Sequence, residues 1–236
     1  MATHDIPPDD PAADPDANYD YASENVERPD LVDDLRARVD GDVRFDSYTR
    51  QLYATDASIY EVLPVGVVFP TSTEDVAAVV EYCADEGIPV LPRGGGTSLA
   101  GQTVNEAVVL DFKHDMDGFV GVDAEAETAR AQAGITLGEL NAALAEDDLK
   151  YAPDPAWGDK SVLGGAIGNN STGAHSLVYE KADGYLESAE VVLADGTATT
   201  FGWVDTDDLD DLADPDGDLE ARVYAEVQRL LDEEAD

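Results

Sequence analysis

The chain has 236 residues, 43% of them hydrophobic, which is enough to bury the core of one large domain or of one and a half. Its 53 acidic residues against 13 lysines and arginines give a formal net charge of −40 at pH 7. This charge excludes nucleic acids and anionic membrane surfaces as partners, because both attract basic residues. We interpret the acidity as adaptation to a halophilic cytoplasm, where molar salt shortens the Debye length to about 3 Å. A negatively charged interaction tail is the alternative.

The cysteine content and the N-terminus indicate a cytoplasmic protein. The single cysteine, Cys83, cannot form a disulfide within the chain and provides too few thiolates for an iron-sulfur or structural zinc site, so we predict no metal site. The first five residues are acidic where a signal peptide is basic, and no apolar run reaches the ~18 residues of a membrane span. We expect no membrane span, and attachment to a membrane only peripherally, through a partner.

Residues 1–40 are predicted to form an acidic, partly disordered tail, because they combine many carboxylates with five prolines. The end of this segment differs from the rest. Leu31, Leu35 and Val39 have the spacing of one helical face, and Asp30 stands where it could cap the helix. We therefore expect a short helix at the end of the tail.

Residues 41–202 are predicted to form the folded body, in which short apolar strands alternate with helices. Helices are expected from Thr73 to about Glu86 and over 136–145, the second opened by a capping box of Thr136 and Glu139. The turn Asp195-Gly196 predicts a β-hairpin. Strands are expected over 65–69, from Pro89, and over 108–112, 119–122, 128–133, 189–193 and 197–201. This order indicates an α+β domain, followed over 203–236 by an acidic linker and a terminal helix at 219–231.

A glycine-rich loop lies between two of the predicted strands and is the most informative segment. It contains Pro92, Arg93, Gly94, Gly95, Gly96, Thr97, Ser98, Gly101 and Gln102. Consecutive glycines let a backbone turn so that several N–H groups face one anion, which is the chemistry of a phosphate cradle. A tight turn alone would explain one or two of these glycines. We place Arg93 in the diphosphate environment, with an ordinary ion pair as the alternative.

Two nucleotide-binding motifs nearly match this loop, and we reject both. The segment 96–103 follows the Walker A spacing, but Gln102 stands where the phosphate-binding lysine is required. Leu99 replaces the third glycine of the dinucleotide fingerprint, and a strand rather than a helix follows the loop. A diphosphate loop held by backbone amides between two strands remains, and this favours a flavin.

With this loop, several later segments resemble in the same order the FAD-linked oxidases of the vanillyl-alcohol-oxidase type, which have a PCMH-type FAD-binding domain. The resemblance covers 64–202 and is strongest to the 2-hydroxyacid dehydrogenases, such as the glycolate oxidase FAD subunit, D-lactate dehydrogenase and the D-2-hydroxyglutarate dehydrogenases with a fused iron-sulfur domain. Besides the loop residues, the resemblance implies flavin contacts at Ala133, Gly134, Pro153, Asp154, Ser161, Gly164, Gly165, Asn170, Gly173 and Val191.

The resemblance implies two subdomains, about 41–110 and 111–202, that hold FAD between them. It also implies oxidation of a small 2-hydroxy acid by hydride transfer to the flavin, with electrons passing to an iron-sulfur protein or a quinone pool. Relatives that bond the flavin covalently to this loop have a histidine at the position of Thr97, so we expect non-covalent FAD.

The sequence departs from this family in two respects. Glu180 stands where the family usually has glycine, which would cost on the order of 1 kcal/mol if the position needs a positive φ. The family's substrate-binding cap domain has no counterpart after the FAD-binding part. The alternative to a complete enzyme is therefore an FAD-binding module without turnover of its own, or a subunit that a separate cap-domain chain completes.

No catalytic residue can be assigned. His114 is expected in a polar, exposed turn, and His175 is more readily explained as a loop residue than as a base. Trp157 is interpreted as a packing anchor in a proline-rich loop rather than as a flavin contact. The acidic run that ends at Asp218 lacks the glycine of a calcium loop, since Leu219 stands in its place.

Overall fold

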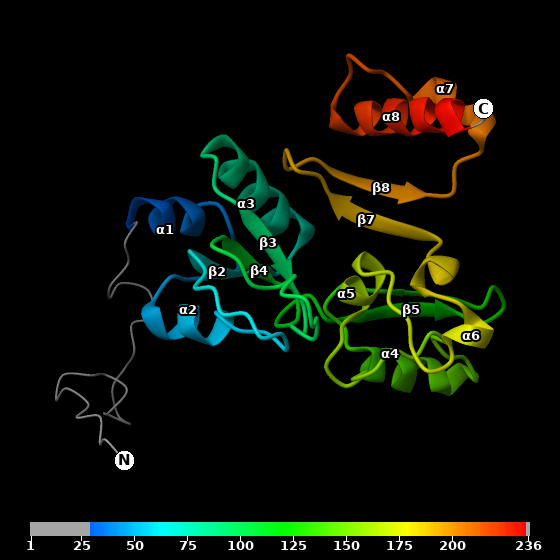
Figure 1. Ribbon diagram of the computed structural model, residues 1–236, viewed down its shortest axis with the longest axis horizontal. Coiled ribbons are helices and arrows are strands. Elements are labelled where there is room, and N and C mark those ends of the chain that lie inside the picture. Colours follow the sequence, from blue (N-terminus) through cyan, green and yellow to red (C-terminus); the bar gives the residue numbers. More distant parts are fainter. Residues whose placement is uncertain (1–28, 235–236) are drawn as a thin grey trace.

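The structure, a computed structural model, describes residues 29–234, and most of the predicted tail lies outside this range (Figure 1). The strands are β1 (Asp42–Arg44), β2 (Gly66–Phe69), β3 (Val90–Arg93), β4 (Val108–Asp111), β5 (Phe119–Asp123), β6 (Thr128–Ala131), β7 (Ser188–Val192) and β8 (Ala198–Gly202). The helices are α1 (Pro29–Arg36), α2 (Ser47–Tyr53), α3 (Thr73–Asp85), α4 (Leu137–Leu144), α5 (Leu163–Gly168), α6 (Ser176–Tyr179), α7 (Leu209–Leu212) and α8 (Leu219–Glu234). Single 3₁₀ turns occur at Ala145–Asp147, Ala182–Tyr185 and Thr206–Asp208.

The first lobe is a four-stranded sheet in the order β1-β2-β4-β3, with helices around it. Strand β1 is antiparallel to β2, whereas β4 is parallel to both of its neighbours. Every residue of β2 and of β4 is buried, which is the pattern of central strands covered on both faces. The carboxyl ends of the three parallel strands therefore lie at one edge, where the glycine-rich loop begins.

Helix α3 covers this sheet with the apolar stripe that the sequence predicts. Val76, Val79 and Cys83 are buried in the main core. The N-cap is Ser72, whose hydroxyl accepts from the Asp75 amide at 3.1 Å, and not Thr73 as predicted from the sequence. Serine and threonine are both good caps, and their order along the chain left the choice open.

The short helix predicted at the end of the tail is α1, and it is part of the folded body. Leu31, Val32 and Leu35 are buried in the same core as α3 and β4. Pro29 begins the helix, so Asp30 lies in its first turn rather than at the cap. Proline is well suited to the first position of a helix, because its missing N–H would have no partner there.

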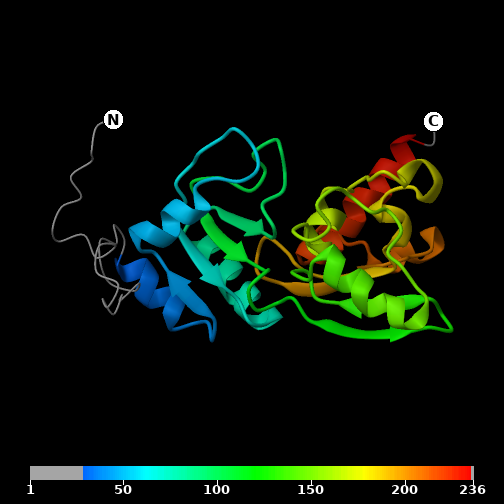
Figure 2. The ribbon, with the colours of Figure 1, turned by 90° about the horizontal axis from the view of Figure 1, so that it is seen from below.

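The second lobe is built on the antiparallel ribbon β5-β6, which packs with α4 and α5 around a smaller core. Figure 2 shows this lobe beside the first along the long axis of the molecule. The predicted capping box opens α4: the Thr136 hydroxyl accepts from the Glu139 amide at 3.2 Å, and the Glu139 carboxylate accepts from the Thr136 amide at 3.2 Å. The hydrogen bonds from Thr136 hold the pKa of Glu139 below its usual value.

The predicted hairpin is β7-β8, which forms a separate two-stranded ribbon. Gly196 takes φ +87° at its tip, as the sequence Asp-Gly suggests. A Cβ there would lie 2.6 Å from the Cβ of Glu81 and 3.0 Å from the carbonyl oxygen of Ala77. The hairpin tip therefore rests on α3 in the first lobe.

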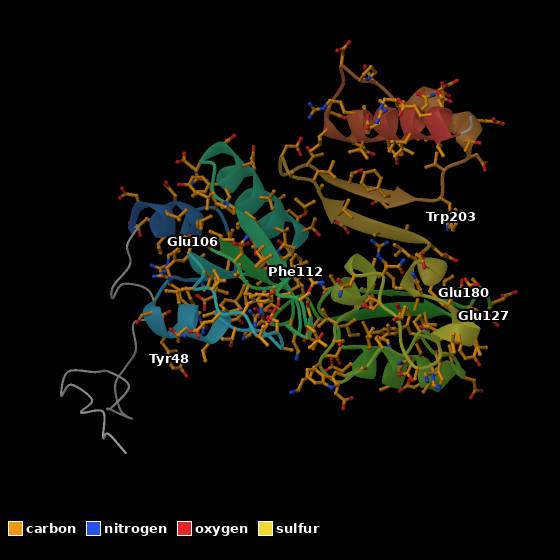
Figure 3. The ribbon with its side chains drawn as sticks, viewed as in Figure 1. Tyr48, Glu106, Phe112, Glu127, Glu180 and Trp203 are labelled. Atoms are coloured by element: carbon orange, nitrogen blue, oxygen red, sulfur yellow. The ribbon has the colours of Figure 1, made fainter. Side chains whose placement is uncertain are left out.

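Four short helices, α2, α5, α6 and α7, were not predicted. Helices α5 and α6 lie in segments rich in glycine or small polar residues, α2 follows closely on a strand, and α7 lies in the acidic run predicted to be a linker. Helix α2 is held by Asp46, which accepts from the Thr49 amide at 2.8 Å. Helix α6 ends at Glu180, which has φ +65° and ψ −153°. This combination is almost confined to glycine, because a side chain collides there with the backbone. Glu180 is labelled in Figure 3, on the second lobe.

One buried carboxylate ties α3 to the first strand. Asp75 accepts from the amides of Thr71 at 2.9 Å, Asp40 at 2.9 Å and Gly41 at 3.1 Å, and from the Thr71 hydroxyl at 2.8 Å. Burial alone would raise the pKa of Asp75, but these hydrogen bonds outweigh it and the pKa lies below its usual value.

We expect Asp75→Ala to lower the free energy of unfolding by about 2 kcal/mol at pH 7, because three partly buried amides lose a charged acceptor. Since the folded-state pKa is lowered, the stabilisation is complete above the unfolded pKa of about 3.9 and is lost as the pH falls below it. Denaturant unfolding at pH 7 and at pH 3.5 measures both effects. Asp85→Ala, on the exposed end of the same helix, is the control; an equal loss in both variants would contradict the prediction.

We expect Glu180→Gly to raise the free energy of unfolding by about 1 kcal/mol, because the strain of a side chain at this φ and ψ exceeds the entropy that glycine adds to the unfolded chain. Thermal unfolding of the variant in molar salt is the measurement. Glu187→Gly, at a neighbouring exposed position with negative φ, should leave the melting temperature unchanged or lower it. A lower melting temperature for Glu180→Gly would show that the strain is absent in solution.

Candidate cofactor site

The glycine-rich loop leaves the carboxyl end of β3 and returns to β4, its parallel neighbour. Ligands of parallel sheets bind outside the carboxyl ends of the strands. Within residues 29–234, the backbone amides from Gly94 to Ser98 donate to no protein acceptor. Gly96 takes φ +61°, which turns the chain inside this run. Five consecutive free donors, without a carboxylate bound among them, are suited to an anion.

The loop approaches the second lobe closely, backbone to backbone at Gly95 and backbone to side chain at Gly94. A Cβ on Gly95 would lie 1.9 Å from the carbonyl oxygen of Lys160, and one on Gly94 would lie 2.1 Å from Cγ2 of Val162. The hydroxyls of Thr97 and Ser161 are 3.1 Å apart. The glycines are therefore required for contact between the lobes as well as for backbone freedom.

The segment Ala133-Gly134 joins the same cluster from β6. The Gly164 amide donates to the Ala133 carbonyl at 2.8 Å, and the Gly134 amide donates to the Met116 carbonyl at 2.8 Å. A Cβ on Gly134 would lie 1.8 Å from the carbonyl oxygen of Phe112. Phe112, at the end of β4, is labelled in Figure 3 between the two lobes.

Arg93 holds the loop through its neighbours' main chain. Its guanidinium donates to the carbonyls of Tyr53 at 3.0 Å, Thr103 at 3.1 Å and Thr55 at 2.8 Å. Burial lowers the pKa of Arg93 below its usual value. The Tyr53 hydroxyl donates in turn to Asp111 at the end of β4, and burial with this hydrogen bond raises the pKa of Tyr53. Arg93 therefore positions the loop, and its place in the diphosphate environment stays a prediction.

A second cluster surrounds Asp154, in the loop before α5. A Cβ on Gly173 would lie 1.9 Å from the Asp154 carbonyl oxygen. His175 Nδ1 is 3.1 Å from the Asp154 carboxylate, and Lys150 Nζ is 3.8 Å from it. Asp154 itself has φ +47°. This cluster joins the predicted residues Pro153, Asp154 and Gly173 to the histidine that the sequence left without a role.

The structure brings eight of the nineteen predicted cofactor residues into one cluster. The cluster between the lobes contains Gly94, Gly95, Gly96, Thr97, Ser161, Gly164, Ala133 and Gly134. Gln102 reaches the second lobe at Asn169, 3.3 Å away, and Asn170 accepts from the Asp183 amide at 3.1 Å. The other predicted residues lie outside the cluster. Pro92 is in β3, Gly165 in α5 and Val191 in β7, and the side chain of Ser98 and Gly101 lie farther along the loop.

Of two ring-bearing residues in loops, Trp157 differs from its predicted place in the structure and His114 agrees with it. Trp157 has φ +64° and is 58% exposed, so it is not the packing anchor that its proline-rich loop suggested. His114 is exposed and pairs with Asp115 at 2.8 Å, as expected for a polar turn.

Among residues 29–234, no group of three histidine, cysteine or acidic side chains is placed to hold a metal ion. None of the helices in this range has the length and apolar character of a membrane span.

Sequence reasoning missed the partners that fix these loops. The carbonyls of Lys160 and Met116 are main-chain groups, which no motif can reveal. Asp111 did carry a signal, because an acidic residue directly after the apolar run of β4 is buried and must find a donor. The free amides of 94–98, the paired hydroxyls of Thr97 and Ser161, and the glycine backbone around them fit the diphosphate of a dinucleotide such as FAD.

Comparisons with known proteins agree with this geometry. The chain is 34% identical over 184 residues to a D-2-hydroxyglutarate dehydrogenase of Pseudomonas putida, which covers 76% of the chain but only 17% of that protein. It is 35% identical over 170 residues to the glycolate oxidase subunit GlcD of Bacillus subtilis, with 70% of the chain and 36% of the relative covered. The chain thus spans only a minor part of the length of these relatives.

Solved structures show the same fold. An alkyldihydroxyacetonephosphate synthase superposes with a TM-score of 0.65 at 25% identity, over 74% of this chain and 35% of that one. The 6-hydroxy-D-nicotine oxidase of Arthrobacter nicotinovorans gives a TM-score of 0.62 at 24% identity, over 70% and 36%. The sequence model of the FAD binding domain matches residues 64–202, which is more than half of the chain. The chain therefore belongs to the family of PCMH-type FAD-binding domains, with FAD as its cofactor.

Proposed function

We propose that this chain is the FAD-binding part of a flavin-dependent 2-hydroxyacid dehydrogenase and that it binds FAD non-covalently. The observation that carries the proposal is the run of free amides from Gly94 to Ser98, held between the lobes by the contact of Gly95 with Lys160. Thr97 has a hydroxyl, which lacks the nucleophilicity of an imidazole, so a covalent bond to the flavin is not expected at this position. We propose residues 41–202 as the FAD-binding body.

The chain's own residues would bind and orient the cofactor. The amides of 94–98 would donate to the diphosphate, and the Thr97 and Ser161 hydroxyls would lie beside it. Arg93 would keep the loop in shape from behind through three carbonyls. FAD, when bound, supplies a hydride acceptor for the oxidation of an alcohol carbon.

The substrate class follows from the relatives rather than from a substrate site. The 2-hydroxy acids D-2-hydroxyglutarate and glycolate are the substrates in the names of the two relatives described above. Oxidation of such an acid needs a base for the hydroxyl proton and a cation for the carboxylate. Of the nearby groups, His175 and Lys150 are both engaged by Asp154. We therefore propose that a cap domain outside the given sequence supplies the substrate site, and that an iron-sulfur protein accepts the electrons in the cytoplasm.

The second candidate function is an FAD-binding module without turnover. It is favoured by Glu180, whose glycine-type backbone angles strain the segment that follows the Asp154 cluster. Turnover by the purified chain would exclude this candidate.

We expect Gly95→Ala to weaken FAD binding by at least about tenfold, because a Cβ 1.9 Å from the Lys160 carbonyl oxygen forces the loop away from the second lobe. Titration of the apoprotein with FAD in molar salt, followed by flavin fluorescence, measures the dissociation constant. Gly121→Ala, with no atom within 4 Å of its new Cβ, is the matched control. Equal affinities in the two variants would argue against this loop as the cofactor site.

We expect the purified chain to carry flavin absorption bands near ~370 and ~450 nm that pass to the supernatant on acid precipitation, as non-covalent flavin does. With D-lactate, glycolate or D-2-hydroxyglutarate and an artificial electron acceptor, the chain alone should show no turnover, because Asp154 engages both His175 and Lys150, the nearby groups that could serve as base and as carboxylate-binding cation. Flavin that stays with the precipitate would disprove non-covalent binding. A colourless chain that takes up no added FAD would overturn the proposed function.

A further inference from the structure

Trp157, in the loop before α5, combines two features that are each unfavourable on their own. The residue is 58% exposed, although an indole is among the largest apolar groups that a fold can bury. Its backbone has φ +64°, a left-handed conformation in which a bulky residue is an outlier. Neither packing nor local backbone preference accounts for this tryptophan. Strained residues of this kind cluster at ligand sites.

The turn that carries Trp157 is held by main-chain hydrogen bonds. The Trp157 carbonyl accepts from the amides of Lys160 and Ser161, both at 2.8 Å. The Gly158 carbonyl accepts from the Gly138 amide at 2.9 Å, at the start of α4. The indole takes part in none of these bonds. The turn would therefore keep its shape with a different side chain at position 157.

The same turn borders the glycine-rich loop. The Lys160 carbonyl oxygen is the atom that a Cβ on Gly95 would meet at 1.9 Å. The Ser161 hydroxyl is 3.1 Å from the Thr97 hydroxyl. The Trp157 carbonyl is thus hydrogen-bonded to both residues of the second lobe that make these contacts. Position 157 is therefore next to the loop whose free amides suit a diphosphate.

A cation accompanies the indole. Lys160 Nζ is 5.9 Å from the centroid of the Trp157 ring, at the outer range of a cation–π contact. An aromatic face and an ammonium group beside a run of free amides match the two parts of a dinucleotide, which are planar rings and a charged diphosphate. The chemistry of the turn therefore complements a ring of the cofactor as well as its phosphates.

We propose that Trp157 is a cofactor-binding residue whose indole stacks on one of the two planar rings of FAD, the isoalloxazine or the adenine, beside the diphosphate held by residues 94–98. This inference rests on the proposed function, because it adds a contact to the same site. Aromatic side chains stack favourably on planar rings in an offset arrangement. The bound ring would cover the exposed indole and offset the strain of its backbone.

The second tryptophan of the chain is a matched control. Trp203, in the loop after β8, is 86% exposed, and Figure 3 shows it apart from Phe112, which lies between the lobes. Its backbone is not left-handed. A single exposed apolar side chain needs no ligand to explain it. Only Trp157 combines exposure with a strained backbone and attachment to the glycine-rich loop.

The affinity test compares Trp157→Ala with Trp203→Ala by equilibrium dialysis of the full chain, as apoprotein, against FAD in molar salt. We expect the dissociation constant to rise at least about tenfold in Trp157→Ala, as on loss of one stacking contact, and to stay at the wild-type value in Trp203→Ala. Trp157→Phe, which keeps an aromatic face, should regain most of the affinity. Equal affinities in the two alanine variants, or no recovery in Trp157→Phe, would overturn the proposal.

Fluorescence tests the contact without altering Trp157. Trp203→Phe leaves Trp157 as the only tryptophan of the chain. Quenching of its emission by ADP, which does not absorb where indole emits, would identify the adenine as the stacked ring. Flavin emission that is quenched in Trp203→Phe loaded with FAD and restored in Trp157→Ala would identify the isoalloxazine. Neither signal in a chain that binds FAD would contradict stacking.

Melting temperatures and FAD uptake separate this proposal from other readings. The apoprotein of Trp157→Ala should melt at the wild-type temperature, because the turn is held by its main chain. Weaker FAD binding together with a lower melting temperature would assign Trp157 a structural role and overturn the proposal. If the wild-type chain and Trp157→Ala bind FAD equally, the stacking proposal alone fails. A wild-type chain that binds no FAD would overturn the proposed function and the stacking with it.

Discussion

The contact between Gly95 and the carbonyl of Lys160 is the constraint on which the site depends. Two backbones from different lobes meet there with no side chain between them, so any other residue at this position would separate the lobes. The same approach fixes where the amides of 94–98 lie relative to Ser161 and Gly164. Arg93 and the Tyr53–Asp111 pair support the loop from the first lobe. The cofactor cradle is thus a product of main-chain packing, and its few polar side chains hold the main chain in place.

Much of this arrangement could be predicted from the sequence, because its signals are local. The capping box at Thr136 and the Asp195-Gly196 turn each specify a short stretch of backbone, and both predictions were confirmed. What could not be predicted depends on contacts between distant segments. The sequence shows that Arg93 is charged, but not that carbonyls from the end of α2, from Thr55 after it and from Thr103 farther along the glycine-rich loop surround it. Trp157 likewise has the composition of a core residue, and its exposure follows from a left-handed backbone that no local motif indicates.

The acidic composition acts differently at the surface and in the interior. Most carboxylates are exposed, where salt screens their mutual repulsion within a few ångströms. Two of the three buried ones have several donors: Asp75 is bound by three amides and a hydroxyl, and Asp111 is bound by the Tyr53 hydroxyl and the Lys113 amide. The third, Asp46, is bound by the Thr49 amide through one oxygen. Ions in solution cannot replace such fixed donors. Dilution of the salt would therefore affect the periphery of the fold before the two hydrogen-bonded centres of the first lobe.

The tip of the β7-β8 hairpin adds a second tie between the lobes. Gly196 rests against Ala77 and Glu81 of α3, well away from the glycine loop in the chain. A body held at one place can swing about it, whereas a body held at two places retains only rotation about the line that joins them. The two contacts therefore confine relative movement of the lobes to a hinge about the line that joins them. A cofactor held between the lobes would leave by that one rotation or by local displacement of the loops.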